Sequence, residues 1–244
     1  MLILRAQNMK LMKLAFKKET ALPMLALVFA SGVAAALVAS RMVWTGSARD
    51  GFLLWNLFLA WLPLVFALLA CDAYRNKSGR SWCFLGWAGA WLLFFPNAPY
   101  IFTDFTHLSS RFHGQYWVDL VLILICALTG LVLGFVSLFL MQSVVARMLG
   151  RAVSWLFIAG VAGLSGIGIY LGRILRFNSW DVVVKPLALG RDLGHLAANP
   201  QSHLHSVKFS LLFATFLFIA YLMLYALTHL RHTQPGAPAS PPAI

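Results

Sequence analysis

The chain has 244 residues, of which 61% are hydrophobic and only 11% are charged, and its mean hydropathy is +0.80. Soluble domains usually contain about 25% charged residues. This composition excludes a soluble globular enzyme and indicates a protein embedded in a lipid bilayer. The informative unit of length is then the membrane-crossing helix of about 20 residues.

Positive charge is in excess, with 19 Lys and Arg against 7 Asp and Glu and a net charge of +12. These cations lie mostly between apolar runs, as in membrane proteins that are oriented by the charge of their loops. A nucleic-acid-binding protein would instead gather them on one soluble face. We therefore expect the lipid bilayer as a partner and no nucleic acid. The Cys and His spacings match no established metal motif, so no metal site is predicted and any cofactor stays unknown.

Six apolar runs are separated by polar breaks, at residues 22–40, 51–71, 82–95, 117–142, 152–175 and 209–229. They are too long and too continuous for the alternating strands of a membrane barrel. The sequence predicts an all-α, polytopic membrane protein with about six transmembrane helices in residues 22–230. A basic segment, 1–21, precedes this domain, and a disordered Pro-rich tail, 231–244, follows it.

The connecting segments predict the orientation. Eleven Lys and Arg lie on the side of the N-terminus and eight on the opposite side, and five of the eleven precede the first run. Because cations before the first span usually dominate, we expect both termini in the cytoplasm of a multi-pass inner-membrane protein. The first apolar run is longer than the core of a secretory signal, which predicts an uncleaved anchor.

The third run is short. It covers about 15 residues from Ser81 to Phe95, or roughly 22 Å of helix, against a hydrocarbon core of about 30 Å. Pro96 and Pro99 explain the end of this run, since a helix through them would lose the hydrogen bonds to the carbonyls of Leu92 and Phe95.

Polar side chains follow this break. Asn97 is close enough to satisfy one free carbonyl, and Asp104 and His107 are spaced to share a helical face. A carboxylate beside an imidazole could move a proton or bind a metal, so Asp104 and His107 are candidate catalytic residues and Asn97 a candidate substrate-binding residue. In the alternative interpretation, Asn97 only caps the broken helix and Asp104 pairs with His107 at the headgroup level.

A second polar stretch lies at the outward end of the fifth run. Arg173 and Arg176 are three residues apart, and Asn178 and Asp181 follow within two turns. Two guanidinium groups suit a phosphate or carboxylate ligand, so these four are further candidate substrate-binding residues. Alternatively, the arginines complement the helix dipole and reach toward lipid headgroups, and Asn178 and Ser179 cap the next segment.

The predicted orientation brings both stretches to the outer face, where they could form one polar site. Asp119, at the start of the fourth run, would lie at the same face, or would simply be a favourable acid in a first helical turn. Two pairs of glycines four residues apart predict close helix packing: Gly130 with Gly134, and Gly168 with Gly172.

The segments FFPNAPYIFTDFTHL and GRILRFNSWD resemble signature segments of an uncharacterised family of bacterial multi-span membrane proteins, domain of unknown function 1361. The resemblance extends roughly from the second run to the sixth. It implies a bacterial inner-membrane location and no established activity.

Three classes of function fit these features. An enzyme or binding protein would use the arginines for a lipid-linked or phosphorylated envelope substrate, with Asp104 and His107 as the acid–base pair. A transporter or channel would use the same residues as a gate, but it would need ionisable groups near the membrane midplane, and the sequence indicates none there. A structural or assembly protein would need only ion pairs such as Asp104 with Arg173 or Arg176. We favour an outward-facing polar site and leave catalysis open.

Overall fold

The computed structural model describes residues 21–76, 82–110, 116–177, 179, 181–184, 186–187, 190–191, 194 and 204–228. In chain order, the helices are α2 (Ala21–Thr45), η1 (Ala48–Asp50), α3 (Gly51–Asn76), α4 (Trp82–Phe94), α5 (Asn97–Tyr100), η2 (Ile101–Ser110), α6 (Tyr116–Leu149), α7 (Arg151–Arg173), α8 (Asp181–Val184) and α10 (Leu204–Thr228). All the regular elements in these residues are helical, which confirms the predicted all-α class. The basic segment before Ala21 and the Pro-rich tail lie outside the described residues.

Five helical stretches are long and apolar enough to cross a membrane: Leu22–Thr45, Ala48–Arg75, Tyr116–Leu149, Arg151–Arg173 and Val207–Thr228. Their outer surfaces carry large apolar side chains, such as Phe29, Leu156 and Leu212, each 73% exposed. A soluble monomer rarely exposes apolar patches of this extent, whereas hydrocarbon covers them without penalty. The chain is therefore a membrane protein. The third predicted run, which is not among these five, forms α4; this helix has only 13 residues and ends at Phe94, one residue before the predicted end of the run.

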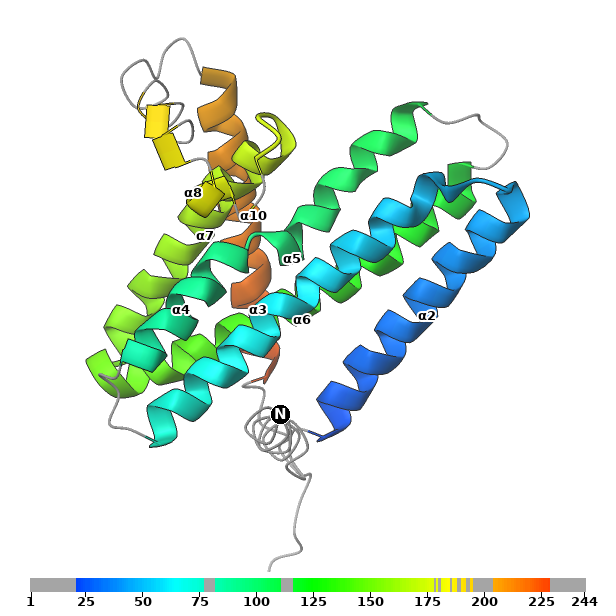
Figure 1. Ribbon diagram of the computed structural model, residues 1–244. Helices are drawn as coiled ribbons and strands as arrows, with labels where there is room; N and C mark the ends of the chain where they lie inside the picture. Colours follow the sequence, from blue (N-terminus) through cyan, green and yellow to red (C-terminus); the bar gives the residue numbers. More distant parts are fainter. Residues whose placement is uncertain are drawn as a thin grey trace, which may run out of the picture.

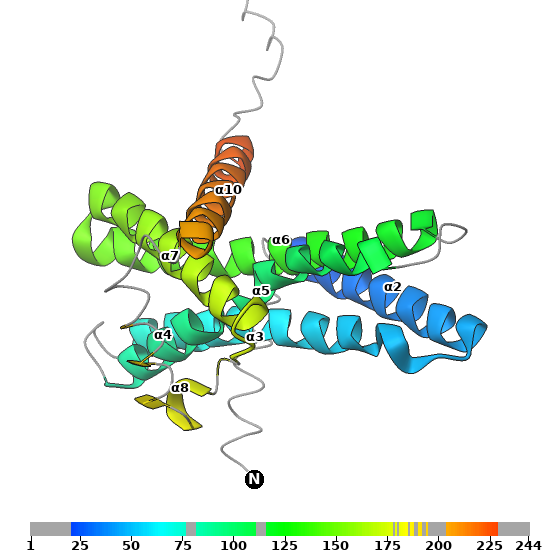
Figure 2. The ribbon, with the colours of Figure 1, turned by 90° about the horizontal axis from the view of Figure 1, so that it is seen from above.

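The helices pack around α3 and α6, which lie side by side through the middle of the molecule (Figure 1). Helix α2 packs along α6 and α3 at one end, and α4 packs along α3 at the other. Helix α7 contacts α6, and α10 packs on α7 and projects from the layer that the other helices form (Figure 2).

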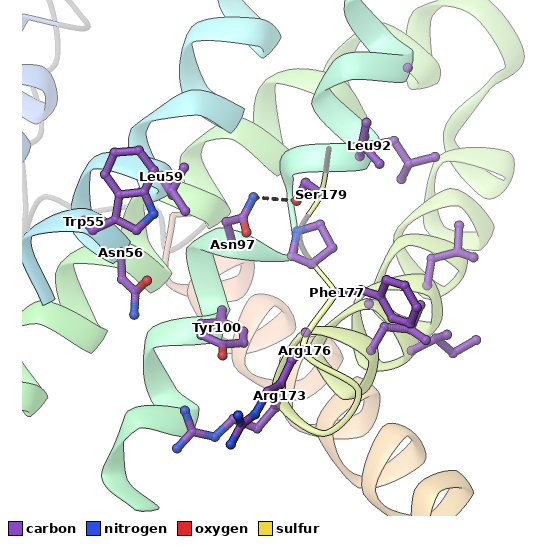
Figure 3. A pocket seen from close by; sticks show the side chains of 18 residues that line it. Trp55, Asn56, Leu59, Leu92, Asn97, Tyr100, Arg173, Arg176, Phe177 and Ser179 are labelled. Atoms are coloured by element: carbon purple, nitrogen blue, oxygen red, sulfur yellow. Dashed lines mark hydrogen bonds between the residues drawn. The ribbon is translucent and has the colours of Figure 1, made fainter. Parts of the chain in front are cut away.

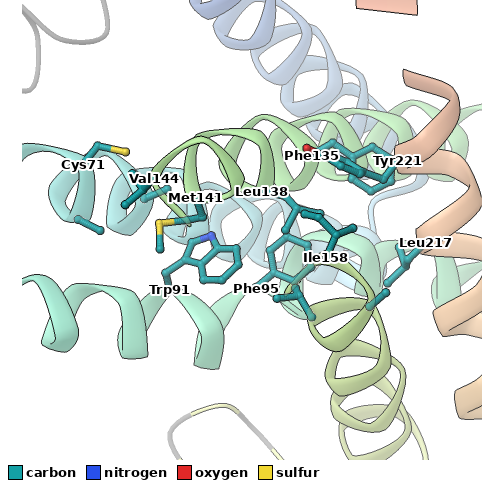
Figure 4. Packing of buried hydrophobic residues seen from close by; sticks show 14 of the residues in the cluster. Cys71, Trp91, Phe95, Phe135, Leu138, Met141, Val144, Ile158, Leu217 and Tyr221 are labelled. Atoms are coloured by element: carbon teal, nitrogen blue, oxygen red, sulfur yellow. The ribbon is translucent and has the colours of Figure 1, made fainter. Parts of the chain in front are cut away.

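Two apolar clusters result from this arrangement. The first joins α4, α7 and α10 to the C-terminal halves of α3 and α6, with Trp91, Phe95 and Ile158 at its centre (Figure 4). The second joins α2 to the N-terminal halves of α3 and α6 and to α5 and η2. Buried polar side chains are paired across helices, since the Tyr221 hydroxyl donates to Gln142 Oε1 at 2.6 Å. Such bonds help to hold helices together where lipid offers no hydrogen-bond partner.

The polypeptide turns between the two clusters at the proline break. The amide of Ala98 donates to the carbonyl of Phe95 at 3.1 Å, and the amide of Tyr100 donates to that of Pro96 at 3.1 Å. The Phe95 carbonyl, to which Pro99 cannot donate because it has no amide hydrogen, thus accepts from Ala98 instead. As a result, α4 belongs to the first cluster and η2 to the second.

Helix α6 holds one side of this turn through its glycine pair. A Cβ atom at Gly130 would lie 2.8 Å from the carbonyl oxygen of Ala98, and one at Gly134 would lie 2.9 Å from the Ala98 Cβ. Since real Cβ atoms do not approach other atoms so closely, α6 can contact the turn only because both positions are glycine.

Helix α7 holds the other side through the second pair. A Cβ at Gly168 would lie 2.9 Å from Pro96 Cγ, and one at Gly172 would lie 3.2 Å from Tyr100 Cε2. The predicted close packing is present at both pairs, and the surface that they approach is the short turn rather than another long helix.

We expect Gly168→Ala to lower the free energy of unfolding by about 1–3 kcal/mol, because the added methyl group meets the rigid ring of Pro96. Gly160→Ala on the same helix is the matched control, since nothing lies within 4 Å of a Cβ there. It should be neutral or stabilise the helix by up to about 1 kcal/mol. Equilibrium unfolding in mixed detergent micelles would measure both. Equal effects of the two substitutions would contradict the tight contact at Gly168.

Candidate functional site

A cavity of about 1070 Å³ lies between α3, the segment from α4 to α5, and the C-terminal part of α7 (Figure 3). Its wall is formed by eighteen residues: Trp55, Asn56, Leu59, Gly89, Leu92, Leu93, Pro96, Asn97, Tyr100, Leu164, Ile167, Gly168, Leu171, Gly172, Arg173, Arg176, Phe177 and Ser179. The glycines that hold the turn on α7 thus also line the cavity.

The charged and aliphatic parts of the wall are separated. Arg173 and Arg176 lie at one end of the cavity, and Leu92 lies toward the other, as Figure 3 shows. Asn97 lies between them. Such a cavity suits a ligand that has both a charged group and an apolar part.

Asn97 ties the helix break to the chain after α7. Its Nδ2 donates to the carbonyl of Phe94 at 3.1 Å and to Ser179 Oγ at 3.0 Å. The amide therefore caps α4, as the alternative interpretation predicts, but at Phe94 rather than at Leu92 or Phe95. It also joins the two polar stretches, which are 82 residues apart in the chain.

Asp104 is 1% exposed and has partners on both carboxylate oxygens. Its Oδ1 accepts from Arg173 Nη1 at 3.2 Å, and its Oδ2 accepts from Asn56 Nδ2 at 2.9 Å. Arg173 Nη2 also donates to the hydroxyl of Thr106. One carboxylate thus connects η2 to both α7 and α3. This is the ion pair that the structural interpretation requires.

Arg176 differs from Arg173. Its side chain is exposed and lines the cavity, and no residue in the described part of the chain forms an ion pair or hydrogen bond with it. Its φ of 60° is in the left-handed region, which a residue with a long side chain rarely adopts. The turn is held by the amide of Phe177, which donates to the carbonyl of Leu171 at 3.1 Å. Backbone strain of this kind occurs preferentially at functional sites.

The remaining predicted residues are placed as follows. The backbone of His107 lies in η2, but its side chain is outside what the structure describes, as is all of Asn178. Asp181 is buried in α8 and does not line the cavity. Within the described residues, no three His, Cys, Asp or Glu side chains are grouped to hold a metal. The catalytic role of Asp104 and His107 stays a prediction.

Asp119 belongs to a different polar cluster. Its Oδ1 accepts from Arg41 Nε at 3.0 Å and Arg41 Nη2 at 2.9 Å, and both side chains are buried. The guanidinium also lies 5.7 Å from the ring centroid of Trp44. This ion pair joins α2 to α6.

Sequence analysis considered Ser179 only as a cap of the next segment and did not single out Asn56 or Tyr100, although all three line the cavity. Asn56 had a detectable signal, because it is a single amide in an otherwise apolar run. Tyr100 had none, since it lies in a segment whose direction depends on the turn after α4.

The fold and the cavity define a helical membrane protein with a cavity that is polar at one end. The family described as "Protein of unknown function (DUF1361)" matches residues 55–222, and the chain belongs to this family. The matched region contains the whole cavity wall and leaves out α2. The comparisons with curated proteins and with solved structures find no match.

We expect Asp104→Asn to lower the free energy of unfolding by roughly 3 kcal/mol, because it removes the Asp104 carboxylate from the partly buried charge of Arg173. The double substitution Asp104→Asn with Arg173→Gln should cost less than the sum of the single substitutions, with a coupling of at least about 1 kcal/mol. Unfolding of all four proteins in detergent would complete the cycle. Strict additivity would show that the ion pair contributes nothing to stability.

Proposed function

We propose that this protein is a multi-pass protein of the bacterial inner membrane that binds a lipid-linked or phosphorylated envelope substrate in an outward-facing cavity. The observation that carries the proposal is Arg176, which faces the cavity without a partner in the described part of the chain. A cation beside apolar walls is stabilised by an anion, and a guanidinium binds phosphate or carboxylate through paired hydrogen bonds.

The surroundings of Arg176 support an anionic ligand. Ser179 lies on the same wall, and its hydroxyl, which accepts a hydrogen bond from Asn97 Nδ2, can donate one to a ligand. The leucines of the opposite part of the wall exclude water, which strengthens the attraction between the guanidinium and an anion. The ligand's charged group would therefore bind at this end of the cavity.

Asp104 and Arg173 support a bracing role within the same site. Each already has charged and polar partners, so acid–base chemistry by Asp104 would need the contacts to Arg173 and Asn56 to open. We therefore propose that Asp104 positions Arg173, and that binding rather than catalysis is the primary function. The second candidate, an assembly protein, rests on this same ion pair.

The topology belongs to the proposal as well. The excess of Lys and Arg on the side of the N-terminus favours cytoplasmic termini, which makes the α2–η1 connection external and the α6–α7 connection internal.

The single-cysteine substitutions Ser47→Cys and Arg151→Cys would test the topology, since Ser47 lies in the α2–η1 connection, Arg151 directly follows the α6–α7 connection, and both are exposed. Cys83, an exposed native cysteine, would first be replaced by Ser, while Cys71 and Cys126 are buried. In intact cells, a membrane-impermeant maleimide should label the first position only, and both after permeabilisation. Labelling of the second position only would invert the proposed orientation.

Butyl phosphate, with butanol as its uncharged counterpart, is a suitable probe of the anion site. We expect butyl phosphate to raise the unfolding temperature of the full chain in nanodiscs, because a ligand that binds the folded state stabilises it. Arg176→Gln should weaken this binding about tenfold, equivalent to about 1.4 kcal/mol. Arg151→Gln, at the other end of α7, should not change it. If Arg176→Gln bound butyl phosphate as well as the unchanged protein, the proposed site would be wrong.

A further inference from the structure

The apolar part of the cavity continues onto the surface that the membrane covers. Leu164 of α7 lines the cavity and is still 53% exposed, and Ile167 is 36% exposed. On α4, Gly89 lines the cavity and is also exposed. Since Leu164 lies on a membrane-crossing helix whose outer surface is apolar and exposed, we interpret this part as a groove that opens sideways between α4 and α7.

The groove has room for a hydrocarbon chain. On the core side, α4 and α7 touch through the stacked rings of Trp91 and Phe157, at 5.8 Å between ring centroids. On the cavity side, α4 presents a glycine, and nothing lies within 4 Å of a Cβ added at Gly89. The side chains facing this space from both helices are aliphatic: Leu92, Leu93, Leu164, Ile167 and Leu171.

The groove also ends at the charged residues. From Leu164 to Arg173, α7 extends about 14 Å at its usual rise per residue. Gly89 lies about 10 Å before Pro96 along α4. The apolar groove is therefore many carbon atoms long and terminates at Arg173 and Arg176, which is the arrangement that a lipid with one anionic headgroup would fill.

We infer that the ligand is such a lipid: its phosphate-type headgroup binds at Arg176, and its hydrocarbon chain lies in the groove between α4 and α7, which it enters sideways from the bilayer. This inference rests on the proposed function and names the substrate class of that site. Because the bilayer is as apolar as the groove, the chain gains little free energy by moving from one to the other. The headgroup then supplies the affinity, and the groove selects ligands by the shape of the chain.

The test compares dodecyl phosphate with butyl phosphate in phosphatidylcholine nanodiscs that hold the full chain. Gly89→Phe would fill the groove, and the space around this position lets the protein fold. Gly86→Phe is the matched control, because Gly86 is also an exposed glycine of α4 with nothing within 4 Å of an added Cβ, but it does not line the cavity. Dodecyl phosphate partitions equally into the nanodisc bilayer whichever protein is present, so a difference in binding between a variant and the unchanged protein does not come from partitioning.

We expect Gly89→Phe to weaken the binding of dodecyl phosphate at least tenfold and to change that of butyl phosphate less than twofold, since a four-carbon chain is too short to reach Gly89. Gly86→Phe should change neither. If Gly89→Phe left both ligands unaffected while Arg176→Gln still weakened butyl phosphate, the lipid groove would be wrong and the anion site would stand. If the unchanged protein bound neither ligand, both proposals would fail.

Discussion

Two prolines three residues apart prevent the chain after Phe94 from continuing as an α-helix, and glycines on α6 and α7 hold the turn that results. The rest of the structure depends on this arrangement. Because the turn packs against backbone on both sides, α4 and η2 contribute to different apolar clusters. The same turn separates α4 from α7 on one side, and the cavity occupies that space.

The two arginines of the cavity wall differ in whether neighbouring residues balance their charge. Arg173 is fixed between Asp104 and Thr106, and its charge is balanced within the protein. Arg176 is carried by a strained backbone to the cavity wall, where no described residue balances its charge. Asp104 and its partners thus form a rigid set beside a cation that has no partner among the described residues. Binding sites commonly have this arrangement, in which a rigid set of residues holds the group that contacts the ligand.

The second ion pair stabilises the opposite part of the molecule. Arg41 and Asp119 are both buried and join α2 to α6, outside the cavity. Helix α2 lies before the region that the family shares, so this pair attaches a helix of the chain's own N-terminal part to the shared helices. Removing either partner alone would leave a buried charge without compensation and weaken the contact between α2 and α6.

The sequence by itself determined the all-α class, the approximate positions of the long apolar helices and the end of α4 just before Pro96, because hydrophobic length and proline chemistry act locally. It also indicated both glycine pairs, although not the turn that they hold. Only the tertiary structure decided which polar residues meet. Asp104 and Arg173 were predicted for one outer face, but their contact depends on how helices far apart in sequence are packed. The same is true of the hydrogen bond from Asn56 to Asp104 and of the ion pair that Asp119 forms with Arg41, away from the cavity. Side-chain pairing across helices is set by the direction and depth of each helix, and neither quantity is encoded in a local pattern of residues.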